Sequence, residues 1–557
     1  MALPVSFEIL AILSLLPLSW LLYERGRALL MFFQQEEYSY TRFIVWWASK
    51  LAVDRLASGV YLIVLVAGLM DAGAGTLLVV GSVGLLLAPF VGVIVSRAAL
   101  KDAKKPLVMT ARATRILMFF IFFGFLFAAI GAAAISFGGL TEESAQLAAL
   151  AGYTFALIQA LPFVMILADI ALKPMEARIK NKYLMDAKNK LAVLNPTVIA
   201  ITGSFGKTST KQILCHILGS SAPTLATPGS VNTEMGITRI IREQLRPEHR
   251  YFIVEMGAYG PGSIARLCRL TPPHASMVTA VGAAHYERFK TLKAVSIAKF
   301  EIAEATIATG GFTVVSQRGV PDDLRKERMA AVDTTYYLMG PDGPFELVSS
   351  RQDAQGIEVV LKDHHHKEEG KEAEEITLRA PVFGLHQAEN VAMAASMARL
   401  LGLPWAVIKA ALRNSPQTRH RLEVFKTPGA PTILDDAYNS NPRGFKEALE
   451  VLGLLAKPDG KRICITPGMV ELGAIHDEEH ARLGKIAAKA CSHIMVVTPD
   501  RIPTFVKAIE TSPDGAILET FATQAEAEAA AKSIAGDGDA ILFENNLPDL
   551  YEARVRF

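Results

Sequence analysis

The sequence predicts a multi-domain chain in which an α-helical transmembrane domain precedes two α/β domains. Three observations indicate this fold class. The first 175 residues hold only 22 of the 112 charged side chains in the 557-residue chain, and long apolar stretches fill this part. From about residue 195, short runs of β-branched residues alternate with helical patterns, as in a parallel sheet covered by helices. A second series of such runs follows residue 417.

Five apolar stretches in the first part each approach or exceed the length that crosses the hydrocarbon core of a membrane as a helix. They are residues 6–23, 56–74, 76–96, 116–138 and 146–170. We expect the first stretch to be retained, because no basic residue precedes it and no clear small-residue cleavage site of a signal peptide follows it. The predicted membrane domain covers residues 1–172 with about five transmembrane helices, and a basic juxtamembrane linker covers 173–194.

The charges of the connecting loops orient these helices. Residues 97–115 carry six basic side chains against one acid, and residues 173–190 also carry six basic side chains. The loops on the opposite side are short and acidic. Because basic loops remain on the cytoplasmic side, we expect a multi-pass protein of the cell (inner or plasma) membrane. Its N-terminus would lie outside, and the domains after residue 172 would lie in the cytoplasm.

The predicted cytoplasmic segment 24–55 combines polar residues such as Gln34 and Glu36 with aromatic residues such as Trp46. This mixture is typical of a helix that lies at the head-group level. Two interpretations stay open, an interfacial anchor and a site for a lipid-linked head group. The spans contain few ionisable residues, Asp169 being one, so we expect no proton or ion pathway.

The remaining chain is expected to form two α/β domains, at 195–416 and 417–557. An antiparallel insert is predicted at 340–380, followed by a helical stretch at 386–413. The insert carries three adjacent histidines in a Lys/Glu-rich tract, for which we expect a solvated loop and not a metal site. The predicted strands are 197–202, 251–255, 275–279 and 312–315 in the first domain and 432–435, 462–466, 494–498 and 540–543 in the second.

Charge and cysteine content exclude several classes of partner. The 57 basic and 55 acidic residues nearly cancel, and neither half carries a basic tail, so we expect no nucleic-acid partner. The four cysteines lie far apart without a CxxC pair, which indicates reduced thiols and excludes a cysteine zinc site. They are Cys215, Cys268, Cys464 and Cys491.

A glycine-rich loop follows the first strand of the central domain and precedes a helix. Residues 202–210 read Thr-Gly-Ser-Phe-Gly-Lys-Thr-Ser-Thr. In such a loop the backbone N–H groups approach phosphates, Lys207 reaches the outer phosphates and Thr208 ligates Mg²⁺. Ile201 stands where the Walker A pattern has glycine, so this loop is a shortened form. We therefore expect a nucleoside triphosphate here.

Further segments, in the same order along the chain, resemble motifs of the Mur ligases, ATP-dependent amide-bond ligases of peptidoglycan synthesis. The resemblance is to the MurF branch, which adds D-Ala-D-Ala. The segments are 227–236, 255–258, 282–285, 299–301, 384–390, 435–442 and 468–473. The resemblance covers about residues 195–557 and implies a central Mur-ligase ATPase domain followed by a Rossmann-like C-terminal Mur-ligase domain.

The resemblance also implies the roles of individual residues toward ATP, Mg²⁺ and the substrates. The implied ATP contacts are Gly203, Ser204, Phe205, Gly206, Lys207, Thr208, Ser209, His386, Asn390, Arg421 and Asp436. The implied Mg²⁺ ligands are Thr208, Glu255, His285 and a carbamylated Lys299. The residues with implied catalytic roles are Lys207, His285 and Lys299. The implied substrate contacts are Asn232, Thr233, Tyr438, Asn439 and Asn441.

The reaction implied by the resemblance has two steps. A substrate carboxylate attacks the γ-phosphate of ATP to give an acyl phosphate, and an amine then displaces phosphate. In the MurF branch a soluble N-terminal domain holds the UDP part of the substrate, whereas here membrane spans stand in that place. We therefore expect a membrane-anchored ligase that acts on a lipid-linked or membrane-associated carboxylate, with an amino acid or a dipeptide as amine donor. A poly-γ-glutamate or capsule-type amide ligase is the alternative, and the amine donor separates the two.

Two segments depart from the pattern of the branch. Residues 316–323 replace its usual Asn-x-Asp-Asp, and Glu544-Asn-Asn546 stands where Lys-Gly-Ser is usual. These departures concern the adenine contacts and the amine substrate. We expect no ATP-driven transporter, because no LSGGQ-like segment follows the loop, and no inactive scaffold, because the implied catalytic and metal-binding residues are retained together.

Overall fold

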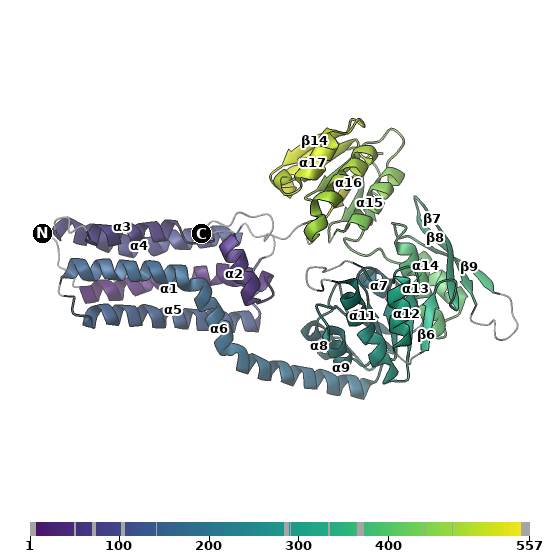
Figure 1. The fold of residues 1–557 in the computed structure, drawn as a ribbon, viewed down its shortest axis with the longest axis horizontal. Coiled ribbons are helices and arrows are strands. Elements are labelled where there is room, and N and C mark those ends of the chain that lie inside the picture. Colours follow the sequence, from purple (N-terminus) through teal and green to yellow (C-terminus); the bar gives the residue numbers. More distant parts are fainter. Residues whose placement is uncertain are drawn as a thin grey trace. The chain divides into compact units, whose positions relative to one another are not determined.

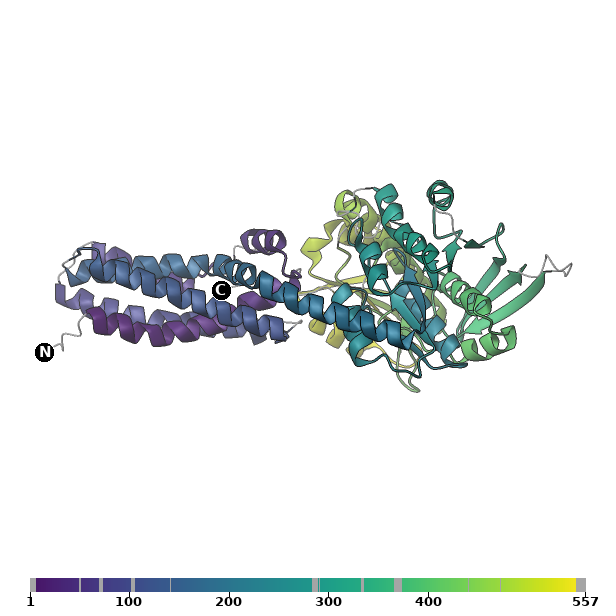
Figure 2. The same ribbon diagram turned by 90° about the horizontal axis from the view of Figure 1, so that it is seen from below.

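The computed structural model describes residues 7–49, 52–69, 74–101, 106–140, 142–282, 289, 291–331, 335–364, 373–438, 440–470 and 472–546. The chain divides into two compact units (Figures 1 and 2). One contains the chain up to Lys180, and the other contains Asn181–Asn546. His285 and Asn439, two of the predicted site residues, lie outside the described residues.

The first unit is helical, as predicted. Its helices are α1 (Phe7–Gln35), α2 (Tyr40–Ser49), α3 (Leu56–Leu69), α4 (Ala74–Lys101), α5 (Ala111–Phe137) and α6 (Glu143–Leu194). Among the described residues, α5, α6 and the Gly81–Lys101 part of α4 are long and apolar enough to cross a membrane, and α3 contributes the shorter apolar segment Leu56–Ala67. The apolar helical character is therefore confirmed, while five spans and their orientation stay predictions.

Segment 24–55 contains more helix than the sequence indicated. The first helix continues to Gln35. The apolar residues 28–33, which follow the charged residues Glu24 and Arg25, are buried and stabilise this continuation. The ring of Trp46 in α2 stacks on Phe32 in α1 with ring centroids 4.3 Å apart. The aromatic residues of this segment thus pack against one another inside the unit.

Four charged side chains are buried in this helical unit, Glu24, Arg25, Asp54 and Asp169. Arg25 forms an ion pair with Asp54. Arg97 Nε donates to Glu24 at 2.8 Å, and Arg112 donates to Asp169 at 2.9 Å. Each buried carboxylate is therefore matched by an arginine, which offsets the cost of removing a charge from water. These ion pairs were not predicted from the sequence, because this part of the chain is mostly apolar and the two partners of each pair lie far apart in it.

The central domain of the second unit contains, in its described part, a nine-stranded sheet of order β2-β3-β1-β4-β5-β6-β7-β8-β9. Strands β1 to β6 pair in parallel, and β7, β8 and β9 form the predicted antiparallel insert. The strands are β1 (Thr197–Thr202), β2 (Thr224–Ala226), β3 (Tyr251–Glu255), β4 (Ala275–Val278), β5 (Phe312–Ser316), β6 (Thr335–Met339), β7 (Phe345–Asp353), β8 (Gly356–Asp363) and β9 (Glu374–Ala380).

Helices cover both faces of this sheet. Alternate residues of β1 point to opposite faces and pack against different helices. Ile199 and Ile201 pack with α7 (Lys207–Gly219), α13 (Gln387–Leu400) and α14 (Trp405–Arg413). Val198 and Ala200 pack with α8 (Glu234–Glu243), α9 (Ser263–Leu270) and α11 (Leu292–Ile307). The last turns of α6 join the second layer through buried Ala187 and Leu191, so this part of the helix belongs to the core of the central domain. Helix α12 (Asp322–Ala330) packs beside α11.

The C-terminal domain contains, within the described residues, a six-stranded sheet of order β10-β11-β15-β12-β13-β14. Only β10 (Glu423–Phe425) pairs antiparallel; the parallel strands are β11 (Thr432–Asp436), β12 (Arg462–Thr466), β13 (His493–Val497), β14 (Ile517–Phe521) and β15 (Ala540–Glu544). Its helices are α15 (Pro442–Leu455), α16 (His476–Ala490), α17 (Pro503–Glu510) and α18 (Gln524–Ile534). The parallel strands end at one edge, where ligands bind in open α/β sheets.

Candidate active site

The glycine-rich loop connects β1 to α7 and has no room for side chains at its two glycines. Gly206 begins α7 with φ of +81°, and a Cβ there would collide with the amide oxygen of Asn390. A Cβ on Gly203 would collide with the hydroxyl of Thr279. That hydroxyl donates to the Phe205 carbonyl at 2.6 Å and ties the loop to the end of β4. The loop is thus a fixed backbone cradle ahead of a helix N-terminus, the form that suits phosphate.

Lys207 lies over this cradle. Its Nζ donates to the Gly203 carbonyl at 2.6 Å. Burial of the ammonium lowers the pKa of Lys207; Glu255 opposes this shift, while Arg421 and Lys211 add to it. Several cations therefore face one another around the loop, and a polyphosphate would supply the missing negative charge.

Glu255 at the end of β3 is the carboxylate of this cation-rich site, and it is 1% exposed. It accepts a hydrogen bond from Thr208 Oγ1 at 3.0 Å and from Asn232 Nδ2 at 3.2 Å. Lys211 Nζ lies 2.9 Å from the same carboxylate. Burial alone would raise the pKa of Glu255, but Lys211 and Lys207 hold it below its usual range. The structure thus brings predicted residues Thr208, Glu255 and Asn232 together, with oxygen donors that suit Mg²⁺.

Lys211 was not predicted as a site residue. It is 1% exposed and follows Lys207 by four residues, so both lysines lie on one face of α7. That spacing is the signal in the sequence that could have identified it.

Lys299 on α11 is buried, being 4% exposed. Burial and the charge of Lys207 hold the pKa of Lys299 well below its ordinary value. The described part of the chain gives it no ion-pair partner. Glu301, two residues further along α11, accepts from the backbone N–H groups of Gly262 at 2.5 Å and Ala265 at 2.9 Å. Lys299 is therefore a buried amine that loses its proton more easily than a surface lysine.

Asn390 and His386, predicted to flank adenine, occupy the start of α13 and have different partners. Asn390 accepts from Thr210 Oγ1 at 3.1 Å, which ties α13 to α7. His386 Nδ1 lies 2.5 Å from Glu447 Oε2 on α15, and the His386 N–H donates to the same oxygen at 2.7 Å. Burial alone would raise the pKa of Glu447, but these contacts lower it to about 2. Glu447 was missed because it follows His386 by 61 residues.

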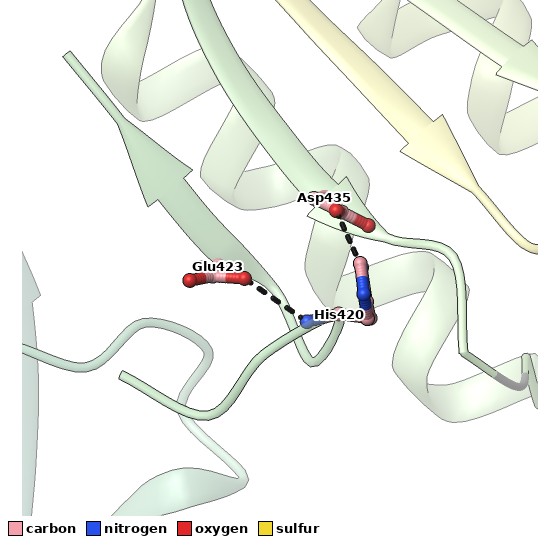
Figure 3. A group of neighbouring side chains, drawn as sticks. All are labelled: His420, Glu423 and Asp435. Atoms are coloured by element: carbon pink, nitrogen blue, oxygen red, sulfur yellow. Dashed lines mark hydrogen bonds and ion pairs between the residues drawn. The ribbon is translucent and has the colours of Figure 1, made fainter. Parts of the chain in front are cut away.

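Arg421 sits in a tight turn before β10. The residues on either side of it, His420 and Leu422, both have left-handed backbones with φ of +56° and +51°. Figure 3 shows how His420 is held: its Nδ1 lies 2.7 Å from Asp435 Oδ2, and its N–H donates to Glu423 at 3.1 Å.

The ligand atoms of His420, Glu423 and Asp435 lie within 4.8 Å of one another, but these side chains are partly or fully exposed and their contacts are explained by the turn. On the other side, the Leu422 N–H donates to Asp436 Oδ1 at 3.0 Å. Asp436 thus helps to hold the Arg421 turn.

Tyr438 connects the C-terminal domain to the central one. The Arg421 guanidinium lies 4.3 Å from the centre of the Tyr438 ring. The Tyr438 hydroxyl accepts a hydrogen bond from Ser230, in the loop that leads to α8. The same loop contains Asn232 and ends at Thr233, the N-cap of α8. The side chain of Asn441 caps α15, accepting from the Gly444 N–H at 3.0 Å, so its role in the described structure is local.

Glu544 is a buried acid that the motifs did not predict as a site residue. It is fully buried at the end of β15, directly beside Asp436 in the register of β11 and β15. One carboxyl oxygen accepts from Ser440, and the other has no hydrogen-bond partner. Burial and the neighbouring Asp436 raise the pKa of Glu544 well above its ordinary value. The edge of this sheet therefore holds a buried acid that gives up its proton less readily than an exposed glutamate.

The sequence of this chain is similar to the sequences of known enzymes. Residues 201–398 match the Mur ligase middle domain, and residues 420–544 match the Mur ligase glutamate ligase domain. The UDP-N-acetylmuramoyl-tripeptide–D-alanyl-D-alanine ligase of Mycobacterium tuberculosis (strain CDC 1551) is 31% identical over 364 residues, covering 62% of this chain and 67% of its own length. The enzyme of that name from Escherichia coli (strain K12) is 30% identical over 296 residues, covering 53% and 62%.

Solved structures of enzymes of this kind are also similar to this chain. MurF from Acinetobacter baumannii is 26% identical with a TM-score of 0.55, over 66% of this chain and 77% of the other. MurF ligase from Thermotoga maritima in complex with ADP, at 24% identity and a TM-score of 0.54 over 68% and 82% of the two chains, shows the same fold. Both domain matches begin after residue 200, so the helices that precede them lie outside these matches.

Proposed function

This chain belongs to the Mur ligase family, and we propose that it is a membrane-anchored member that joins a lipid-linked carboxylate to a dipeptide amine. As a MurF-like ligase it is an ATP-dependent, ADP-forming peptide ligase that forms a C–N bond. The membrane, the nature of the acceptor and the roles of individual residues are parts of the proposal.

One observation carries the proposal, the convergence of the phosphate loop, Glu255 and Lys299 at one edge of the central sheet. Lys207 and the loop amides would hold the phosphates of ATP, with Arg421 and Asp436 reaching the nucleotide from the C-terminal domain. Thr208 and Glu255, whose side chains lie 3.0 Å apart, would hold Mg²⁺, which would neutralise the phosphate charge. The cation-rich surroundings and the fixed glycine cradle fit the phosphates, and the oxygen atoms of Thr208 and Glu255 fit Mg²⁺.

The reaction we propose follows from these positions. An acceptor carboxylate oxygen attacks the γ-phosphorus of ATP, and ADP leaves, which gives an acyl phosphate. The donor nitrogen then attacks the acyl carbon and loses a proton, and phosphate leaves. Both steps bring anionic groups together, so the chain contributes positive charge at Lys207 and orientation of the two substrates. Asn232, Thr233 and Tyr438 would lie on the acceptor and donor side.

Lys299 has the properties that carbamylation requires. A buried amine with a lowered pKa loses its proton more readily than a surface lysine, and the uncharged nitrogen adds to CO₂ with loss of a proton. The anionic carbamate would be a metal ligand beside His285. Protein exchanged into ¹³C-bicarbonate should show a carbamate signal by NMR that is absent from Lys299→Ala. A wild-type spectrum without that signal would remove the carbamate from the proposal.

The acceptor class follows from what precedes the ligase domains. Helices able to cross a membrane precede the middle domain, and the last of them, α6, continues into the core of the central domain. We propose a multi-pass plasma-membrane protein with cytoplasmic ligase domains that acts on a lipid-linked, peptide-bearing carboxylate. The names of the relatives favour a second candidate, a soluble UDP-linked acceptor, and they favour a D-alanyl-D-alanine donor over glutamate.

The proposal is tested with the full chain in lipid nanodiscs, with ADP and phosphate release measured for each acceptor. We expect Lys207→Ala to abolish ADP release, because the loop then lacks the cation that faces the outer phosphates. Lys485→Ala, a change of an exposed lysine on α16, is the control and should leave the rate unchanged. Unchanged turnover in Lys207→Ala would overturn the ligase site. Equal rates on UDP-linked and lipid-linked acceptors would overturn the lipid preference alone.

A further inference from the structure

A hollow of about 480 Å³ lies between the last turns of α6 and the helices α8 and α9, separate from the phosphate loop. Figure 1 shows α8 and α9 beside this end of α6. The residues that line the hollow include three cations, one carboxylate and two apolar side chains. They are Lys188, Arg266, Arg269, Glu234, Met185 and Leu270.

The three cations, Lys188, Arg266 and Arg269, are exposed and are not held in ion pairs within the described part of the chain. Glu234 supplies one negative charge, which leaves the lining with a net positive charge. Like charges that surround one hollow repel each other, and an anion placed among them removes this repulsion. Arginine in particular presents paired donors that match phosphate oxygens.

The hollow adjoins the loop of the candidate active site. Helix α8 begins at Glu234, two residues after Asn232, whose amide donates to Glu255 at 3.2 Å. The Gly257 N–H, just after β3, donates to the Asn232 carbonyl at 3.1 Å, so this loop and the segment leading to α9 are fastened together. A ligand in the hollow would therefore contact α8 and α9. These helices follow the loop that contains Asn232 and the segment after β3.

The wall formed by α6 lies outside the matched Mur-ligase domains, which begin at residue 201. Lys188 and Met185 belong to the part of α6 whose Ala187 and Leu191 are buried in the ligase core. The hollow is thus completed by a segment that joins the ligase domain to the preceding helices.

We propose that this hollow binds the diphosphate ester of the acceptor, with phosphate oxygens on the cations and the esterified group against Met185 and Leu270. The inference rests on the proposed function, because it assumes that the carboxylate acceptor carries a diphosphate. Each phosphate of a diphosphate diester carries a negative charge, which complements the positive lining. Nucleoside diphosphates and isoprenoid diphosphates share this chemistry.

Direct binding to the full chain in detergent tests the inference. UDP and farnesyl diphosphate are titrated separately by calorimetry, in the presence of saturating non-hydrolysable ATP analogue so that the phosphate loop is occupied. We expect saturable binding of at least one probe, and we expect Arg266→Ala/Arg269→Ala to weaken it about tenfold or more, as loss of charged hydrogen bonds does. Arg239→Ala, a change of an exposed arginine on α8 outside the hollow, should bind the probe like the wild type.

Each outcome is decisive. Binding of UDP alone or of farnesyl diphosphate alone, with the expected loss in the double variant, supports the site and identifies its source of diphosphate. Absence of binding by the wild type, or equal affinities of wild type and double variant, overturns the inference. Affinity for the ATP analogue is measured in the same samples. If the analogue binds and turnover depends on Lys207 while both probes fail, the diphosphate site is wrong and the ligase assignment stands.

Discussion

The two sheet edges of the Asn181–Asn546 unit carry opposite kinds of ionisable side chain. At the edge of the central sheet, Lys207, Lys211 and Lys299 lie around the carboxylate of Glu255. At the edge of the C-terminal sheet, Asp436 and Glu544 lie side by side. The first edge suits a polyphosphate and the second suits an amine, which are the groups that a C–N ligase must bring together. In the proposed reaction, each domain would thus present side chains suited to one of the two partners.

The edges also differ in how they are held. Backbone geometry holds the central edge, where glycines at 203 and 206 let the loop approach its neighbours without side chains. Side-chain hydrogen bonds hold the C-terminal edge, where Asp436 accepts from the Leu422 N–H and Asp435 contacts the His420 ring in the Arg421 turn. We therefore expect a change of charge at the central edge to have a larger effect on activity than the loss of a single contact at the C-terminal edge.

The strongest test of this contrast is Glu255→Gln. The substitution keeps the shape of the side chain but leaves Lys211 buried without its counter-charge and removes the proposed metal ligand. We expect the free energy of unfolding to fall by about 3 kcal/mol, as when one partner of a buried ion pair is lost. ADP release should fall on the order of a hundredfold. Thermal unfolding and the ADP assay on the full chain measure both effects.

Glu248→Gln changes an exposed carboxylate of the same domain and should leave both quantities unaltered. If Glu255→Gln were as active as this control, the central edge would not depend on its carboxylate, and the comparison between the two edges would fail.

Site residues that belong to a local sequence pattern could be predicted, whereas those whose partners are distant in sequence could not. Residues 203–209 were identified from the sequence, because a phosphate loop is a local pattern of glycines between a strand and a helix. Lys211, Glu447 and Glu544 were missed, because their partners are distant in sequence: Glu255 for Lys211, His386 for Glu447 and Asp436 for Glu544. The α/β fold of both domains was predicted from strand and helix patterns. The continuation of α1 to Gln35 was not, because charged residues within it are paired only in the folded unit.

A smaller effect is expected at Tyr438, where the two edges meet. Tyr438→Phe removes the hydroxyl that accepts from Ser230 but keeps the ring under Arg421. We expect the rate of ADP release to fall about threefold for this variant, as for loss of one neutral hydrogen bond. Tyr438→Ala removes the stacking as well and should cost about tenfold. Steady-state kinetics on the full chain measures both.

Ser230→Ala is the matched variant on the central side. If the hydrogen bond couples the domains, Ser230→Ala and Tyr438→Phe should have equal effects that do not add in the double variant. Additive effects would show that the two side chains act independently and that the edges are not joined through this contact.

The smallest effect is expected from Glu544→Gln, which replaces a buried carboxyl group whose pKa is raised with an amide of similar shape that does not ionise. Because burial and Asp436 raise the pKa of Glu544, the folded chain retains a proton that the unfolded chain releases above about pH 4.5. Between that pH and the raised pKa the unfolded state binds fewer protons, so stability falls as pH rises. Wild type and Glu544→Gln should therefore unfold at similar temperatures at pH 5, whereas at pH 8 the variant should be the more stable. Glu519→Gln, at an exposed position of β14, should follow the wild type at both pH values. A Glu544→Gln variant that loses stability with pH as steeply as the wild type would show that Glu544 is ionised in the fold, and the C-terminal edge would then be acidic in charge as well as in composition.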